Sequence, residues 1–359
     1  MGRTSQTNTD PALEKLLQSA ADRFERGDLP GALSAADAAI ARAPRSVPAL
    51  HYRAATLAEM GAVDEAAEVY ERALGLDPGD LDVIYGAAEL YADRAQTDDR
   101  DVEWLGRGLD LALRGKQLAR AQDDVELAGD FALLAGIALA QLGRADEALL
   151  RLDEALLALP DSPDVMRERG IVLFELLRLD EARRQLHAAE RLAPRDAWVQ
   201  HALGLVAERS GDLKEAERRL ARARKHDPDA FPKPVTLAQE EFDAVLEDAL
   251  AALPEPIRRY LGNVAITVEE IPSDQDLLAT APPLSPQSLG MFRGTPIGQQ
   301  GSMDPWSHLP SSIVLYQRNL ERAVRTREEL IQEIRVTLIH EVGHFLGLDE
   351  DQLWERGLD

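Results

Sequence analysis

The fold of most of this chain is set by a stretch that recurs along it, Gly61-Ala62-Val63-Asp64-Glu65-Ala66-Ala67-Glu68-Val69-Tyr70-Glu71-Arg72-Ala73-Leu74-Gly75-Leu76-Asp77-Pro78. Its glycine is followed five residues later by alanine and seventeen residues later by proline. Neighbouring units lie 34 residues apart, and one of them carries Leu177 in the glycine position. The recurring positions are Gly27, Gly61, Gly143 and Gly211, then Ala32, Ala66, Ala148, Ala182 and Ala216, then Pro44, Pro78, Pro160, Pro194 and Pro228.

Each unit is typical of a helix, a tight turn and a second helix that ends at the proline. Gly136, Gly170 and Gly204 repeat at the same period upstream of the turn, where closely crossing helices require a small residue. The pattern resembles the tetratricopeptide repeat and covers about residues 13–230, with five clear units. The longer stretch 81–128 predicts a further repeat with an enlarged turn around 96–100. The resemblance implies an all-α solenoid whose concave surface binds a protein or peptide partner.

The 34-residue period ends after Pro228, and the next segment has a different character. Prolines at 232 and 234 block a helix and indicate a linker. An amphipathic helix is predicted over 237–253, and strands over 264–268, 290–294 and 312–316. We therefore predict a small α+β domain after the solenoid. The predicted divisions are a disordered tail (1–12), the repeat solenoid (13–230), a linker (231–236) and the α+β domain (237–359).

The last long element predicted is a helix over 327–346. Thr326 and Glu329 have the spacing of a capping box, and Gly347 follows the apolar periodicity where a left-handed cap commonly ends a helix. This helix carries His340-Glu341-Val342-Gly343-His344. Two histidines four residues apart lie on one helical face and can reach one metal ion, while Glu341 can accept a proton from a water molecule.

The absence of cysteine restricts a transition-metal site in this chain to nitrogen and oxygen ligands. Gly347, three residues after His344, allows the chain to leave the helix and turn back beneath the metal. The sixth residue after His344 is Glu350, which we predict as the third ligand of a zinc ion (Zn²⁺) beside His340 and His344. Asp349 and Asp351 are its rivals, and His308 is a further alternative.

Residues from about 240 to the end resemble the minimal zincin-like metallopeptidase family. The resemblance is carried by Phe242–Val245, Leu250–Pro254, Leu289–Pro296, Ile313–Arg318 and Val336–His344. It implies a zinc-dependent peptidase in which Glu341 is the catalytic acid and base. Family members usually have aspartate where this chain has Glu350. By residue type, His308, Tyr316 and Arg318 could stabilise an oxyanion, although each is also an ordinary structural or surface residue.

Charge and hydropathy limit the classes of partner. The 359 residues include 40 basic and 64 acidic side chains, for a net charge of −24. This balance argues against binding to nucleic acid or to an anionic membrane surface. No apolar run reaches the roughly 18 residues of a membrane span, and the N-terminus lacks a signal-peptide pattern. We therefore expect a cytoplasmic protein without nucleic-acid or membrane partners.

Three hypotheses follow for the function. The first is a zinc metallopeptidase whose repeats recruit or orient a protein substrate. The second is a protein-binding adaptor scaffold in which the zincin-like domain is catalytically idle. The third is a latent peptidase that is held inactive by its repeats.

Overall fold

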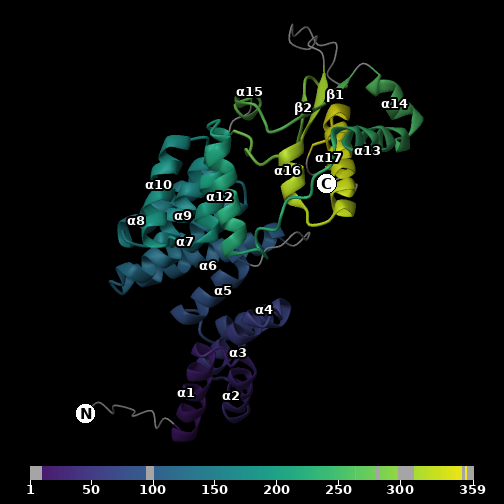
Figure 1. Cartoon of the computed structure of the whole chain (residues 1–359). Helices are drawn as coiled ribbons and strands as arrows, with labels where there is room; N and C mark the ends of the chain where they lie inside the picture. Colours follow the sequence, from purple (N-terminus) through teal and green to yellow (C-terminus); the bar gives the residue numbers. More distant parts are fainter. Residues whose placement is uncertain are drawn as a thin grey trace. The chain divides into compact units, whose positions relative to one another are not determined.

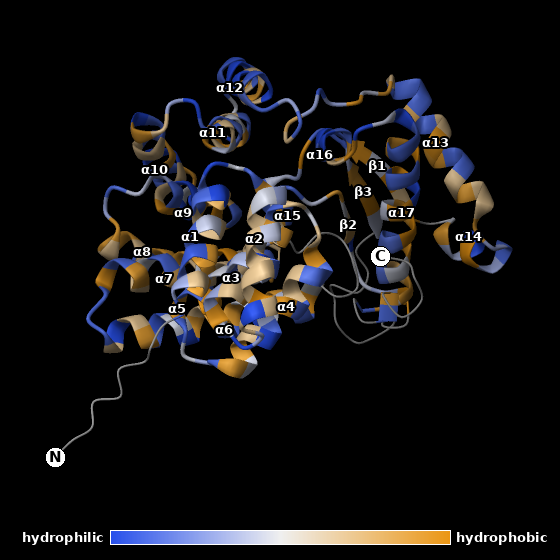
Figure 2. Ribbon diagram, turned by 90° about the horizontal axis from the view of Figure 1, so that it is seen from below, coloured by the Kyte–Doolittle hydropathy of each residue, from blue (hydrophilic) through white to orange (hydrophobic). Residues whose placement is uncertain are grey.

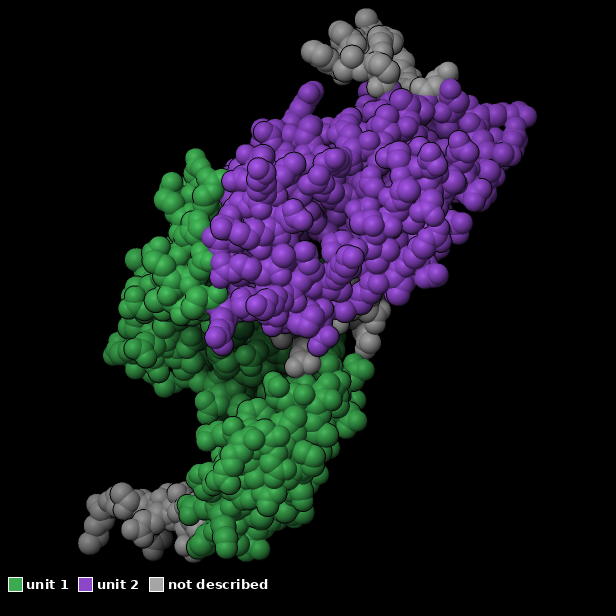
Figure 3. All heavy atoms as spheres, in the orientation of Figure 1, with its two compact units in different colours: residues 1–173, 180–194 green, residues 174–179, 195–359 purple. Residues whose placement is uncertain are grey.

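The computed structural model describes residues 10–93, 101–262, 264–279, 283–297, 311–349 and 352–353. The chain forms two compact units, coloured separately in Figure 3. Unit 1 contains residues 1–173 and 180–194, and unit 2 contains residues 174–179 and 195–359. Among the residues that the structure describes, no helix combines the length and apolar character that crossing a membrane requires.

Unit 1 is built from helices that follow one another along the chain, and each of the first eight packs against its neighbour (Figure 1). The predicted unit within 81–128 contains two helices, whereas the expected turn around 96–100 and the tail up to residue 9 lie outside the described residues. The helices are α1 (Pro11–Glu25), α2 (Leu29–Arg42), α3 (Val47–Glu59), α4 (Val63–Leu76), α5 (Leu81–Asp93), α6 (Asp101–Ala121), α7 (Val125–Gln141), α8 (Ala145–Ala158), α9 (Pro163–Glu175) and α10 (Leu179–Leu192), the last two shared at their junction with unit 2.

The turn glycines adopt the backbone conformation that the repeat pattern predicts. Gly61 has φ +80° and Gly143 has φ +71°, in the left-handed region that glycine tolerates. Leu177 occupies the same position with φ 58°. The turn therefore forms even where a Cβ atom makes this conformation unfavourable.

Glycine is also required where the two helices of a repeat cross. A Cβ atom on Gly136 would lie 2.7 Å from Leu152 Cγ, and one on Gly170 would lie 2.6 Å from Leu186 Cγ. In each case the leucine lies sixteen residues after the glycine, on the second helix. These contacts confirm the predicted close crossings.

Unit 2 contains one further helix pair and the mixed C-terminal region. The pair is α11 (Ala197–Arg209) and α12 (Leu213–His226). The C-terminal region comprises α13 (Gln239–Ala252), α14 (Glu255–Leu261), β1 (Ala265–Glu269), α15 (Asp274–Leu277), β2 (Gly290–Arg293), β3 (Ser312–Tyr316), α16 (Gln317–Ala323) and α17 (Arg327–Leu346). The expected fold class, a helical repeat array followed by a small α+β domain, is confirmed.

The three strands form one sheet in the order β1-β3-β2. β3 pairs in parallel with β1 and antiparallel with β2, so β2 lies at an edge of the sheet. The central strand β3 is hydrophobic (Figure 2), and its residues 313–315 are fully buried. Helices α13 and α17 contact each other, and their apolar side chains share one core with the sheet, including Phe242, Leu246, Leu338 and Phe345.

Helix α17 has the bounds predicted from the sequence. Thr326 accepts a hydrogen bond from the Glu329 amide, and the Glu329 carboxylate accepts one from the Thr326 amide. At the other end Gly347 has φ 90°, and its amide bonds back into the last turn. The three predicted strands are also present, within one residue of the expected bounds. Helices α14 and α16 were not expected. The domain divisions drawn from the sequence stay a prediction.

Candidate active site

The two histidines of α17 point at one another. Their Nε2 atoms are 3.1 Å apart, and the rings meet edge to face. His344 Nδ1 lies 3.1 Å from the carbonyl oxygen of Leu348, just beyond the helix. Because a carbonyl can only accept a hydrogen bond, Nδ1 carries the proton, and a neutral ring then leaves the Nε2 lone pair facing His340.

This arrangement fits a zinc ion. Zinc–nitrogen bonds of about 2.0–2.1 Å at a tetrahedral angle separate two ligand nitrogens by about 3.3 Å. The observed 3.1 Å between the Nε2 atoms is close to that value. The hydrogen bond from His344 to Leu348 also orients the ring, as outer contacts of metal-binding histidines do. The spacing of these two nitrogens is therefore compatible with zinc coordination by His340 and His344.

The third ligand stays a prediction. Glu350 and its rival Asp351 lie outside the described residues, as does His308. Asp349 lines the cleft beside the histidines, but its Oδ1 accepts a hydrogen bond from the Gln352 amide at 2.9 Å. Within the described ranges, no group of three histidine, aspartate or glutamate side chains converges on one point.

The histidines and Glu341 line a cleft of about 710 Å³. One wall is α17, and the other is formed by β2 with the segments on either side of it. Glu341 is only 6 % exposed. Gly290 brings the two walls together, because a Cβ atom there would lie 2.7 Å from Thr337 Cγ2 and 3.1 Å from Glu341 Cγ. Only glycine therefore permits this close approach of β2 to the motif.

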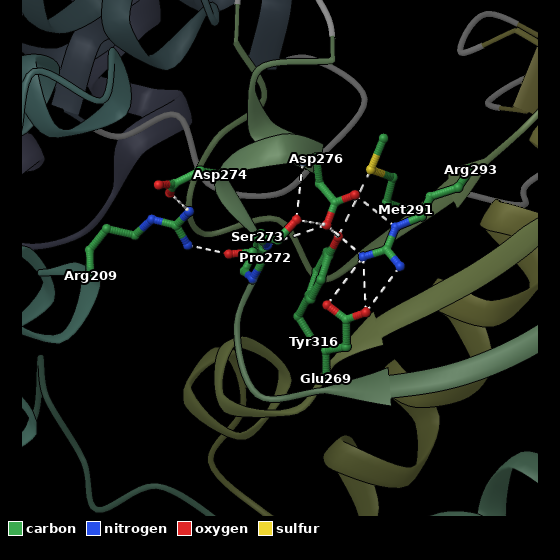
Figure 4. Close-up of polar contacts among 9 residues, drawn as sticks. All are labelled: Arg209, Glu269, Pro272, Ser273, Asp274, Asp276, Met291, Arg293 and Tyr316. Carbon is green, nitrogen blue, oxygen red and sulfur yellow. Dashed lines mark hydrogen bonds and ion pairs between the residues drawn. The ribbon is translucent and has the colours of Figure 1, made fainter. Parts of the chain in front are cut away.

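An ion-pair cluster holds the far end of β2 (Figure 4). Arg293 Nε donates to Asp276 Oδ1 at 2.7 Å, and Arg293 Nη1 donates to Glu269 Oε1 at 3.0 Å. The Tyr316 hydroxyl donates to Asp276 Oδ2 at 3.3 Å. Burial lowers the pKa of Arg293, but the bonds to Asp276 and Glu269 outweigh this effect and raise the pKa overall. The cluster therefore stays charged and fixes the edge strand.

A buried amide holds the segment that leads into β2. Asn319 of α16 donates to the carbonyl oxygens of Pro286 at 3.0 Å and Ser288 at 2.8 Å. Ser288 and Leu289 in this segment line the cleft. Helix α16 therefore positions one rim of the site.

Two of the residues considered for oxyanion stabilisation have other contacts. Tyr316 is buried in the Arg293 cluster, and Arg318 pairs with Glu208 and Glu270. Neither is among the described residues that line the cleft. Among the described residues, these two side chains therefore make contacts that stabilise the fold and do not line the cleft.

Sequence reasoning missed Glu333, Gly290 and Asn319. Glu333 lies seven residues before His340, on the same face of a helix, and lines the cleft. Its position was therefore available from helical periodicity. The roles of Gly290 and Asn319 depend on contacts between distant segments, which the sequence does not specify.

The sequence matches the zincin-like metallopeptidase family over residues 261–358. It matches tetratricopeptide-repeat families over residues 57–99 and 133–197. The chain therefore contains tetratricopeptide repeats (57–197) followed by a zincin-like metallopeptidase domain (261–358), and both resemblances are confirmed. No curated protein matches the sequence.

Two solved structures share the fold over about two thirds of this chain. PilW, a widely conserved type IV pilus biogenesis factor, is 18 % identical with a TM-score of 0.53, and the match covers 66 % of this chain and 100 % of PilW. PilF of Pseudomonas aeruginosa is 16 % identical with a TM-score of 0.50, covering 65 % of this chain and 97 % of PilF. At these identities the likeness concerns the fold alone.

Proposed function

We propose that the C-terminal domain is a zinc-dependent metallopeptidase that hydrolyses peptide bonds in the cleft of α17 and β2. The facing Nε2 atoms of His340 and His344, 3.1 Å apart, carry this proposal. The family match over residues 261–358 supports it. We propose Glu350 as the remaining protein ligand.

Bound zinc supplies a Lewis acid that polarises the scissile carbonyl and acidifies the attacking water. Glu341 follows His340 directly and faces the same cleft. Its carboxylate can accept the proton of that water and deliver it to the leaving amine. Because Glu341 is almost fully buried, the position of this proton carrier is held by the packing around it.

The edge strand supports a peptide as the substrate. β2 pairs with β3 on one side and lines the cleft along Gly290–Phe292. An extended peptide can add to an exposed sheet edge through its main chain, which would lay it across the histidines. Main-chain binding of this kind accepts many sequences, so side-chain preferences come from the walls of the cleft.

We propose that the repeats bind a protein or peptide and so recruit or orient the substrate. Tetratricopeptide repeats supply such a surface through stacked helix pairs. The second candidate is an adaptor scaffold with an idle or latent zincin-like domain. It is favoured by the repeats, α1–α12, which occupy more of the chain than the metallopeptidase match.

Metal content with matched hydrolysis assays tests the proposal. The full chain should hold about one zinc ion, and His340→Ala or His344→Ala should lose it. His226→Ala is the control, because His226 is exposed at the end of α12. Chelation should abolish peptide hydrolysis, and added zinc should restore it. Zinc retained by both motif variants, or hydrolysis indifferent to chelation, would contradict the proposal. A zinc-free chain that captures a partner without hydrolysis would favour the adaptor.

A further inference from the structure

The carboxylate of Glu333 is the feature of the cleft that the proposed chemistry does not use. Glu333 is half-buried on α17 and lines the cleft with the motif residues. Within the described part of the chain, no cation pairs with it, and burial alone raises its pKa. An ionised group that is partly withdrawn from water without a partner costs free energy. A cation brought by a ligand would recover part of that cost.

The charge of the cleft favours a basic ligand. Its described lining contains Glu333, Glu341 and Asp349, and it contains no lysine or arginine. Arg293 at the end of β2 is engaged by Glu269 and Asp276. A bound zinc ion would balance the negative charge of Glu341 and of its own acidic ligands. Glu333 lies further along the helix, so its charge would be balanced less.

Helix geometry gives the spacing between Glu333 and the metal-binding histidines. Seven residues separate Glu333 from His340, which corresponds to about 10.5 Å along α17. An extended peptide advances about 3.3 Å per residue. A side chain of the peptide would therefore reach Glu333 about three residues from the scissile bond.

The surroundings of Glu333 suit a long basic side chain. Val336, one helical turn away, lines the same cleft, as do Leu284 and Leu289 on the opposite wall. Lysine and arginine pack their methylene stems on apolar surface while the charged group seeks an anion.

We propose that Glu333 forms a subsite for a lysine or arginine side chain of the peptide, located about three residues from the bond that is cleaved. The inference rests on the proposed peptide-binding role of the cleft, and it names the substrate class as basic peptides.

Binding measurements test this inference without requiring turnover. Zinc-loaded full-length chain carrying Glu341→Gln would be titrated with peptides that contain arginine, or its uncharged isostere citrulline, at successive positions. Adding Glu333→Gln should weaken the best arginine peptide roughly tenfold and leave its citrulline partner unchanged. Glu328→Gln is the matched control, because it removes the same charge from an exposed position of α17.

The outcomes separate the subsite from the catalytic proposal. Arginine selectivity that depends on Glu333 supports the subsite, even if the unmodified chain cleaves none of the peptides. Equal binding of arginine and citrulline peptides, or equal losses in the Glu333 and Glu328 variants, would overturn it. Cleavage of peptides without any basic preference would overturn the subsite and leave the peptidase proposal intact.

Discussion

Two glutamates of unit 2 occupy opposite electrostatic situations. Glu208, at the end of α11, is 7 % exposed, and two arginines of α16 donate to it. Arg318 Nη1 lies 2.9 Å from Glu208 Oε1, and Arg322 Nη1 lies 2.7 Å from Glu208 Oε2. Glu333 lines the cleft without a cation in the described residues. A buried carboxylate with its partners in place serves the fold, whereas one without a partner is available to a ligand.

Comparison with the equivalent positions of the other repeats shows independently that Glu208 is unusual. The equivalent position, three residues before the turn, is apolar in the other clear units: Phe24, Ala58, Ala140 and Phe174. The next position is Arg209, where those units have Glu25, Glu59, Gln141 and Glu175. Arg209 donates to the carbonyl oxygen of Pro272 and pairs with Asp274. The last helix pair is therefore specialised to join the repeat pattern to the α+β region within unit 2.

Removing Glu208 should produce the largest change in stability. Glu208→Ala leaves two arginines facing a buried site, and loss of one partner from a buried pair costs about 3–5 kcal/mol. Glu270→Ala is the control, because Glu270 also pairs with Arg318 but its side chain is 72 % exposed, so its loss should cost less than about 1 kcal/mol. Urea unfolding with hydrogen exchange of α11 and α16 measures both. Equal losses of stability in the Glu208 and Glu270 variants would contradict the predicted difference between a buried and an exposed partner.

Acid should also weaken the contact of Glu208 with Arg318 and Arg322. Burial raises the pKa of Glu208, but the bonds from Arg322 and Arg318 outweigh it and lower the pKa below its usual 4.5. The stability it contributes is therefore complete above pH 4.5 and is lost as pH falls through the lowered pKa. Burial, with the nearby charges of Arg322 and Arg224, lowers the pKa of His201 to about 4.

Protonation of His201 should reduce the stability of unit 2 at a higher pH than protonation of Glu208 does. The unfolded histidine binds a proton near pH 6.5 and the folded one only near pH 4, so unit 2 should lose stability as pH falls through this window. His201 stacks on Phe231, and His201→Phe should keep the packing while flattening the loss. Urea midpoints between pH 7 and pH 4 measure this effect. An unchanged slope in the variant would show that other groups are responsible.

The sequence predicted what depends on local spacing. The repeat period located the helix pairs, and the capping residues Thr326 and Gly347 located both ends of α17. It did not predict α16, whose seven residues are mostly polar; Asn319, Leu320 and Glu321 are nevertheless buried, and Asn319 makes long-range contacts. The exceptional Glu208 was visible in the repeat register, but its partners lie more than a hundred residues away.

The contact of Glu208 with Arg318 and Arg322 also determines how latency of the proposed peptidase can be tested. A fragment that begins at residue 235 would remove Glu208 from Arg318 and Arg322, so altered activity would not isolate a regulatory effect of the repeats. A division after residue 194 keeps this contact, because Glu208, Arg318 and Arg322 all follow that residue in unit 2.

The proposed peptidase is tested most directly by comparing hydrolysis by the zinc-loaded full-length chain and by its Glu341→Gln variant on the same basic peptides. General acid–base catalysis contributes about 10²–10⁴-fold in rate, so the variant should lose that much turnover while it binds zinc and peptide as before. Equal hydrolysis by the two proteins, or no hydrolysis by the unmodified zinc-loaded chain, would contradict a peptidase centred on α17.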